Sequence, residues 1–397
     1  MRLARPGRRA ALLAVLLTAL SLIAYRQGDL RATAAAAGMP LEFPSQAGTL
    51  VLSELARGLE QPWSLAFLPD GAMLVSERPG RLRLVSREGR IGVPISGLPA
   101  VHARGQGGLL DAALTPDHGT TGGVCFSYAE PRGEDGSATA VACARLDRAS
   151  ASLREMRVIY RQEPALTDSD NHYGSRLVFA RDGTLFVTLG ERYSGRAQAQ
   201  TLDNGLGKVV RLRVDGGIPA DNPFVRSAGA RPEIWSYGHR NPQGAAIHPQ
   251  TGELWISEHG PKGGDELNRV RPGRNYGWPV ITYGREYSGL KVGEGLTEKA
   301  GMEQPQHYWV PSIATSGLAF YTADRIPAWK GSAFVASLKF GQLARLSLEG
   351  DKVVAEERLL EGLNRRLRDV RQGPDGALYL LTDETDGAIL RLDLLKP

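Results

Sequence analysis

Leu68-Pro-Asp-Gly-Ala-Met-Leu-Val75, near the start of the chain, recurs almost unchanged as Gly373-Pro-Asp-Gly-Ala-Leu-Tyr-Leu380 near its end. In both segments a Pro/Asp/Gly turn precedes a short apolar strand, which is the pattern of a β-hairpin. Related segments begin at Leu114, Ala180 and His248, and a degenerate copy runs from Tyr321 to the strand-like Ser332-Ala-Phe-Val-Ala-Ser337. Six copies at a spacing of roughly 45 to 75 residues indicate radial repetition of one small sheet.

The repeat predicts an all-β fold, a six-bladed β-propeller of four-stranded antiparallel blades. Such a ring is usually closed by pairing the two chain ends, and segments 49–55 and 388–394 are the natural partners. A β-sandwich or two smaller β-domains are the competing folds. Since no Pro/Ser-rich linker interrupts the six units, we expect residues 38–397 to form a single propeller domain.

The first 37 residues differ from the rest of the chain. Four arginines precede an apolar run of about 15 residues and a small-residue segment, Ala32-Thr-Ala-Ala-Ala-Ala37, which together are typical of a secretory signal peptide. The run is short for a membrane span, although an uncleaved N-terminal anchor is the alternative. We therefore expect a periplasmic or secreted protein.

The segment 1–37 also accounts for the net charge of +5, because it carries six arginines and one acid. Without it the chain has 42 basic and 42 acidic residues, so it lacks the excess of positive charge that is typical of nucleic-acid-binding proteins. The two cysteines, Cys125 and Cys143, flank a turn-rich segment and would face each other in a hairpin centred near residue 134. An exported protein favours a disulfide there, and two buried free thiols are the alternative.

Several polar residues next to predicted strands are candidates for chemistry. His172 precedes a strand, and a histidine is the usual general base, although a lone histidine is more often structural. Glu191, after the following strand, would orient the imidazole. Arg240 and Asn241 lie between two strand-like segments, and an arginine suits a carboxylate or a developing oxyanion.

A second group of candidates suits a cation and an anionic ligand. The loop Ser257-Glu-His-Gly-Pro-Lys-Gly-Gly-Asp-Glu266 offers free carbonyl oxygens and carboxylates, which calcium prefers, but it has no EF-hand spacing. Arg366 and Arg368 point to one side of a strand and suit a ligand with several carboxylates, and Lys339 is a further cation. Taken alone, the loop and Lys339 are more typical of a solvated surface, and the arginine pair fits a solvated strand edge as well as a ligand site.

Other mechanisms lack their motifs. The sequence contains no Gly-x-Gly-x-x-Gly between a strand and a helix, no Walker loop, no clustered Cys/His zinc spacing and no Gly-x-Ser-x-Gly elbow. A nicotinamide, nucleotide or serine-hydrolase mechanism therefore has no support.

The order of the motifs is more specific than any one of them. From about residue 48 to 395 the chain resembles the soluble aldose sugar dehydrogenases of the glucose/sorbosone dehydrogenase family. The resemblance rests on nine motifs in order: Gly105-Gln-Gly-Gly-Leu-Leu-Asp111, Asn171-His172, Leu189-Gly-Glu191, Trp235-Ser-Tyr-Gly-His-Arg-Asn-Pro-Gln-Gly244, Glu258-His-Gly-Pro261, Gly264-Asp-Glu266, Asn275-Tyr-Gly-Trp-Pro279, Lys339 and Arg366-Leu-Arg-Asp-Val370.

The resemblance implies a six-bladed propeller that uses pyrroloquinoline quinone (PQQ) and calcium. It implies that His172, oriented by Glu191, takes the proton of the anomeric hydroxyl while hydride passes from the sugar C1 to the quinone. The remaining roles that it implies are charge stabilisation on the quinone oxygen by Arg240 beside Asn241, cofactor binding by Lys339, Arg366 and Arg368, pocket lining by Gln106, calcium ligation by the carbonyls of Gly260 and Pro261, and a second calcium at Glu266 and the Tyr276 carbonyl.

The chain departs from the glucose dehydrogenase branch in having Glu191 where an aspartate is usual and Asn at position 171, and it has no clear match to that branch's sugar-facing aromatic loops. We therefore expect a monomer with broad aldose specificity and an external electron acceptor. The alternatives are a calcium-dependent sugar lactonase, which would have little need of Lys339, Arg366 and Arg368, and a non-catalytic carbohydrate- or protein-binding propeller.

Overall fold

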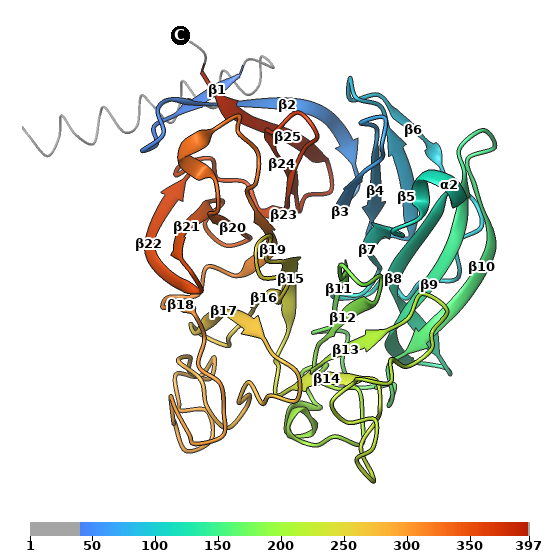
Figure 1. Ribbon diagram of the computed structural model, residues 1–397, viewed down its shortest axis with the longest axis vertical. Coiled ribbons are helices and arrows are strands. Elements are labelled where there is room, and N and C mark those ends of the chain that lie inside the picture. Colours follow the sequence, from blue (N-terminus) through green and yellow to red (C-terminus); the bar gives the residue numbers. More distant parts are fainter. Residues whose placement is uncertain (1–39, 396–397) are drawn as a thin grey trace, which may run out of the picture.

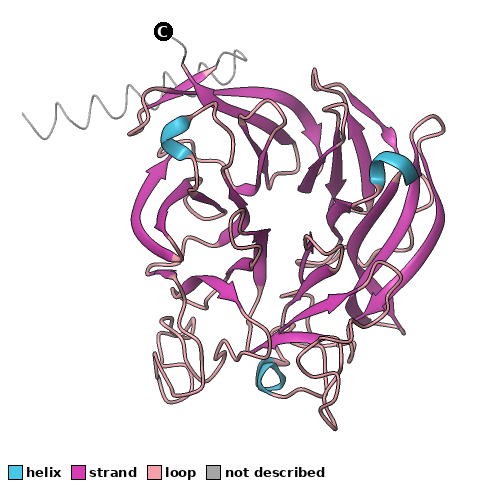
Figure 2. Ribbon diagram, in the orientation of Figure 1, coloured by secondary structure: helices cyan, strands magenta, loops and turns pink. Residues whose placement is uncertain are grey.

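Six antiparallel sheets radiate from a common axis in the computed structural model, which describes residues 40–395 (Figure 1). The predicted six-bladed, all-β propeller is confirmed. In the described part of the chain the helical segments are only α2 (His118–Thr121), η1 (Arg196–Gln200) and η2 (Pro327–Trp329) (Figure 2). No helix in residues 40–395 is long and apolar enough to cross a membrane. The expected signal peptide at 1–37 lies outside the described residues.

Five sheets follow the chain in order. The first contains β3 (Pro62–Phe67), β4 (Met73–Glu77), β5 (Arg81–Val85) and β6 (Ile91–Pro94). The second contains β7 (Leu109–Leu114), β8 (Gly123–Arg132), β9 (Gly136–Asp147) and β10 (Ser152–Arg161). The third contains β11 (Gly174–Phe179), β12 (Leu185–Leu189), β13 (Lys208–Leu212) and β14 (Ile234–Tyr237). The fourth contains β15 (Pro242–Ile247), β16 (Leu254–Glu258), β17 (Asp265–Val270) and β18 (His307–Trp309), and the fifth contains β19 (Thr315–Phe320), β20 (Ala333–Ser337), β21 (Leu343–Glu349) and β22 (Lys352–Leu359).

The sixth sheet joins the two ends of the described chain. It contains β23 (Leu367–Gln372), β24 (Leu378–Thr382), β25 (Gly387–Leu394) and β2 (Leu50–Leu59), with the short β1 (Leu41–Phe43) added outside β2. Leu50 pairs with Leu394 and Leu59 with Gly387, which confirms the predicted closure of the ring. In Figure 1 the blue β2 lies along the red β25.

The repeated turns have one structural role. Each of the six segments found in the sequence joins the first strand of a sheet to its second strand. In three of them an aspartate side chain caps the turn, since Asp70, Asp182 and Asp375 accept from the N–H groups of Ala72, Thr184 and Ala377 at 3.1, 2.9 and 3.2 Å. The intervening glycine, Gly71 or Gly376, has a positive φ of 84° or 78°, which explains why the turn requires it.

This arrangement decides where a site can form. The first strands β3, β7, β11, β15, β19 and β23 surround the axis, and β23 contacts β3 to complete the circle. Because all six turns lie at one end of the ring, the opposite end gathers the residues just before each first strand and just after each second strand. We call this opposite end the site face.

The cysteines lie where the hairpin prediction put them. Cys125 on β8 is directly opposite Cys143 on β9, and the two form a disulfide with Cα atoms 4.0 Å apart. Of the two alternatives left open by the sequence, the structure contains the disulfide.

Candidate active site

His172 and Glu191 form a buried pair on the site face. His172 lies two residues before β11, and Glu191 lies two residues after β12 of the same sheet. The Nδ1–H of His172 donates to Oε2 of Glu191 at 2.8 Å, and their side chains are 5% and 1% exposed. Since a carboxylate only accepts, this bond leaves Nε2 of the neutral imidazole with a free lone pair.

The environment keeps this imidazole neutral. Burial lowers the pKa of His172 below its ordinary value of 6.5, and the cationic Arg240 and Arg192 act in the same direction, whereas Glu191 opposes them. A neutral imidazole with a free Nε2 is the form that a general base needs. His172 also has a positive φ of 52°, and its backbone N–H donates to Oε1 of Gln106 at 3.0 Å.

Arg240 and Asn241 precede β15 and lie beside this pair. The backbone carbonyl of Arg240 accepts from the N–H of Glu191 at 3.0 Å, and its Nη1 donates to the carbonyl of Gly260 at 2.8 Å. The Oδ1 of Asn241 accepts from the N–H of Gly174, at the start of β11, at 3.1 Å. Both side chains are buried.

Next to these residues a cation-rich pocket opens on the site face. Arg368, the second residue of β23, donates to Oε1 of Gln243 at 2.9 Å and to Asp383 at 3.3 Å. Arg366 also pairs with Asp383, at 2.9 Å. Although burial opposes it, the two guanidinium groups lower the pKa of Asp383 to about 2. The pocket lining includes Trp63, Arg78, Gln106, Tyr173, Gln243, His259, Arg366, Arg368 and Asp383.

The predicted residues do not all line this pocket. Gln106, Arg366 and Arg368 do, whereas His172, Arg240 and Asn241 adjoin it through Gln106, His259 and Gln243. Lys339 follows the lining residue Leu338 but is exposed, with its ammonium group 5.0 Å from the Phe340 ring centre.

Four buried donor atoms around the pocket lack a partner among the described residues. They are Arg78 Nε, Arg240 Nε, Asn241 Nδ2 and Arg368 Nε. Unpaired buried donors are unfavourable, and all four would be satisfied by a ligand rich in acceptor oxygens. This donor set fits the tricarboxylate quinone implied by the resemblance.

The predicted calcium ligands lie in two neighbouring places. At Gly260 an added Cβ would come within 2.2 Å of the Gly263 carbonyl oxygen and 2.4 Å of the Gly264 carbonyl oxygen, so a tightly curled Gly/Pro loop concentrates carbonyl oxygens beside Arg240. Such hard oxygen donors fit calcium. In residues 40–395 no cluster of three or more His, Cys, Asp or Glu side chains has the arrangement of a metal site.

The second place surrounds Glu266. Burial and the neighbouring Glu258 raise the pKa of Glu266 to about 8, and Asn268 donates to both carboxylates at 3.0 Å. Tyr276 stacks on His239 at 4.7 Å, and His239 in turn contacts Glu258 at 3.0 Å. Two close carboxylates suit a divalent cation.

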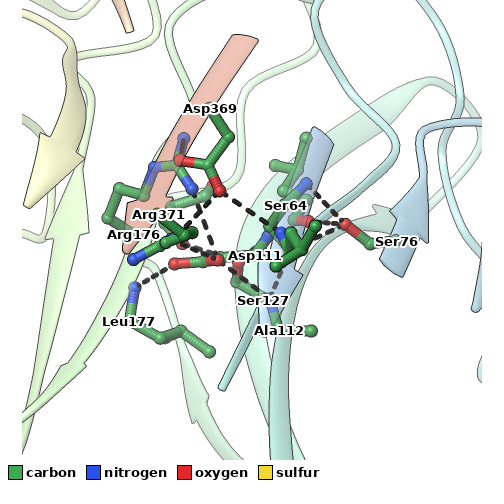
Figure 3. A network of polar contacts seen from close by, with 12 residues as sticks. Ser64, Ser76, Asp111, Ala112, Ser127, Arg176, Leu177, Asp369 and Arg371 are labelled. Carbon is green, nitrogen blue, oxygen red and sulfur yellow. Dashed lines mark hydrogen bonds and ion pairs between the residues drawn. The ribbon is translucent and has the colours of Figure 1, made fainter. Parts of the chain in front are cut away.

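Below the pocket, a buried ion network links strands of three sheets (Figure 3). Arg176 on β11 contacts Asp111 on β7 at 3.5 Å and Asp369 on β23 at 3.1 Å, and Arg371 contacts Asp369 at 2.9 Å. Arg176 also donates to the carbonyl of Gln243 at 2.6 Å and lies 4.2 Å from the Trp63 ring centre. The network therefore supports the floor of the pocket.

Sequence reasoning missed Arg78 and Asp383. Both directly follow the second strand of their sheet, as His259 and Leu338 do, and all four line the pocket. This shared place after the repeated turn and strand was the signal that could have found them.

Comparisons with known proteins found relatives that match most of the chain. The model of the family described as glucose/sorbosone dehydrogenase matches residues 59–391. Aldose sugar dehydrogenase YliI of Escherichia coli is 48% identical over 347 residues, covering 87% of the chain and 93% of that protein. A solved glucose dehydrogenase structure is 51% identical with a TM-score of 0.84, covering 87% and 99% of the two chains. The PQQ-bound form of aldose sugar dehydrogenase from Streptomyces coelicolor is 30% identical with a TM-score of 0.71, covering 87% and 98%.

Proposed function

Since the chain belongs to the glucose/sorbosone dehydrogenase family and is an oxidoreductase, we propose that it oxidises a broad range of aldose sugars at C1 to lactones, using PQQ and calcium. The observation that carries this proposal is the buried His172–Glu191 pair beside a pocket with four unpaired buried donors. A PQQ-bound relative supports the cofactor.

His172 acts as the general base in this proposal. Its Nε2 accepts the proton of the anomeric hydroxyl, and Glu191 holds Nδ1–H so that the lone pair keeps one direction. As the imidazole becomes charged, the carboxylate stabilises it. Arg240 supplies positive charge beside the base, where negative charge develops on the acceptor.

The bound quinone supplies the two-electron acceptor that no side chain provides. Arg366, Arg368 and Lys339 would bind its carboxylates and ring oxygens, and Asn241 and Gln106 would also contact it. The carbonyls of Gly260 and Pro261 would bind the calcium. We assign a second, structural calcium to Glu266 and the Tyr276 carbonyl.

The buried guanidinium groups distinguish this function from that of a lactonase. A hydrolase that works through acids around calcium has no use for Arg368 and Arg78 at the centre of its pocket. A carbohydrate-binding scaffold has no use for a buried base with an orienting carboxylate. We further propose an exported monomer that passes electrons to an external acceptor.

The test is dye-linked oxidation of glucose and other aldoses by apo-protein expressed from residue 38, with PQQ and calcium added separately and together. We expect turnover only when both are present, with a bound-quinone absorption band. If no sugar in the panel is oxidised and no quinone binds on titration, the proposal is wrong and the lactonase becomes the next hypothesis.

A further inference from the structure

Tyr193 is an exposed aromatic residue beside the base. It lies between β12 and β13 on the site face, and 51% of its surface is exposed. Its ring centre is 5.5 Å from that of His172, in an edge-to-face arrangement. Its hydroxyl makes no hydrogen bond to any described residue of the protein. Exposed tyrosines with an apolar ring and a free hydroxyl are well suited to recognition.

The same carboxylate oxygen holds Tyr193 and the base. Oε2 of Glu191 accepts from Nδ1 of His172 at 2.8 Å and from the backbone N–H of Tyr193. One carboxylate oxygen therefore holds both the imidazole of His172 and the backbone of Tyr193, which fixes the position of the tyrosine relative to the base.

The backbone at this point adopts an unfavourable conformation. Arg192 and Tyr193 have φ of 61° and 67°, and the left-handed region is unfavourable for residues other than glycine. Arg192 holds the segment in place, since its buried guanidinium donates to the carbonyls of Asn171 at 2.9 Å and Ser137 at 2.6 Å and lies 3.8 Å from the Tyr173 ring centre. Strain that the surroundings maintain in this way is concentrated at functional sites.

We propose that Tyr193 is the substrate platform of this enzyme, on which the C–H face of an aldopyranose packs while its C1 hydroxyl reaches His172. This inference rests on the proposed dehydrogenase function and adds a specificity-determining residue to it. A buried base and a cationic pocket recognise hydroxyls and carboxylates, and the aromatic residues of the pocket lining, Trp63 and Tyr173, are each only 2% exposed. The Tyr193 ring, by contrast, is an exposed apolar surface in contact with the base.

The test compares Tyr193→Ala and Tyr193→Phe in the holoenzyme. We expect Tyr193→Ala to raise KM for glucose about tenfold while kcat changes less than about threefold, because the lost ring contact serves binding. Tyr193→Phe keeps the ring and should retain KM within about threefold, since one exposed hydroxyl contributes little. The matched control is Tyr379→Ala, whose ring also makes an edge-to-face contact, with Phe67 at 4.9 Å, but lies beside the repeated turns at the other end of the ring. It should leave KM unchanged.

A second readout does not depend on turnover. Titration of PQQ into each apo-variant, followed by tryptophan fluorescence, should give the wild-type Kd for Tyr193→Ala. An unchanged KM in Tyr193→Ala, or a loss of PQQ binding in that variant, contradicts the role of Tyr193 as the substrate platform. In either case, aldose oxidation by the wild-type protein would still support the proposed function. If the wild-type protein itself neither binds PQQ nor oxidises sugars, the proposed function and this inference both fail.

Discussion

Replacing Glu191 with glutamine removes one negative charge from the base and keeps the shape of the side chain. In the protein the carboxylate accepts from Nδ1–H of His172 at 2.8 Å, and both groups are almost completely buried. The amide oxygen of glutamine can still accept this bond, so the imidazole remains a neutral base with its free Nε2. The variant loses the charge that stabilises the imidazolium as the proton is transferred.

The magnitude follows from the kind of bond that is lost. A hydrogen bond to a charged group contributes about 1.5–3 kcal/mol, and a neutral one about 0.5–1.5 kcal/mol. The difference acts when the imidazole becomes charged and is enlarged by burial, so we expect a loss of about 2 kcal/mol in transition-state stabilisation. This corresponds to a decrease of roughly 30-fold in kcat/KM.

The variant should also change the pH profile in a defined direction. In the wild-type protein burial lowers the pKa of His172 below 6.5 and Glu191 partly raises it. The active base is the neutral form, so wild-type kcat/KM should fall only below pH 6.5. Without the carboxylate the imidazolium is less stable, and the acid limb should move to still lower pH.

The assay is dye-linked aldose oxidation by the PQQ- and calcium-loaded protein between about pH 4.5 and 8, a range that spans the ordinary histidine pKa. Glu357→Gln is the matched control, because Glu357 is a largely buried carboxylate on the outermost strand β22 that pairs with Arg345 at 2.7 Å and does not line the pocket. It should keep the wild-type pH profile. An acid limb of Glu191→Gln that moves to higher pH, or wild-type kcat/KM throughout, would refute the role given to Glu191.

Three further changes test other parts of the structure. His172→Gln should lower turnover by about 10²- to 10⁴-fold while PQQ binds with wild-type Kd, so retained turnover counts against this base. Arg368→Met should raise the Kd for PQQ at least about tenfold, measured by fluorescence titration. The double variant Arg368→Met/Asp383→Asn also removes the carboxylate that Arg368 pairs with and so restores the charge balance. It should bind PQQ no better than Arg368→Met, because the guanidinium group itself is missing. Replacing both Cys125 and Cys143 with alanine should lower the free energy of unfolding by about 3 kcal/mol in urea titrations, because the disulfide closes a loop with a sequence separation of 18, and equal stability would contradict this.

Local patterns were sufficient for the architecture. The Pro/Asp/Gly turns predicted six repeats because each turn is formed by neighbouring residues, as in the turns that an aspartate caps and a glycine with a positive φ completes. The pairing of β2 with β25 was also predictable, since a ring of repeats has only its two ends left to join. His172 and Glu191 could likewise be named from the amino-acid order alone, because they lie in motifs that follow one another along the chain.

The tertiary structure decided which side chains meet. Arg368 binds Gln243 across 125 residues of sequence, and Arg176 reaches Asp369 from another sheet. Such contacts depend on closure of the whole ring and have no local signature, so the buried ion network was missed. Lys339, which the motif order groups with the pocket arginines, is exposed in the folded chain, and its role in cofactor binding stays a prediction.

The sequence by itself therefore determined the repeat, its number and the ends that close it, because these depend on turns and strands formed by neighbouring residues. Only the folded ring decided that Cys125 and Cys143 are bonded, that His172 is buried against Glu191, and that unpaired donors from three sheets surround one pocket. The reason is that the burial of a side chain and the charges around it depend on which sheets pack next to it, and this packing is complete only once all six sheets are in place.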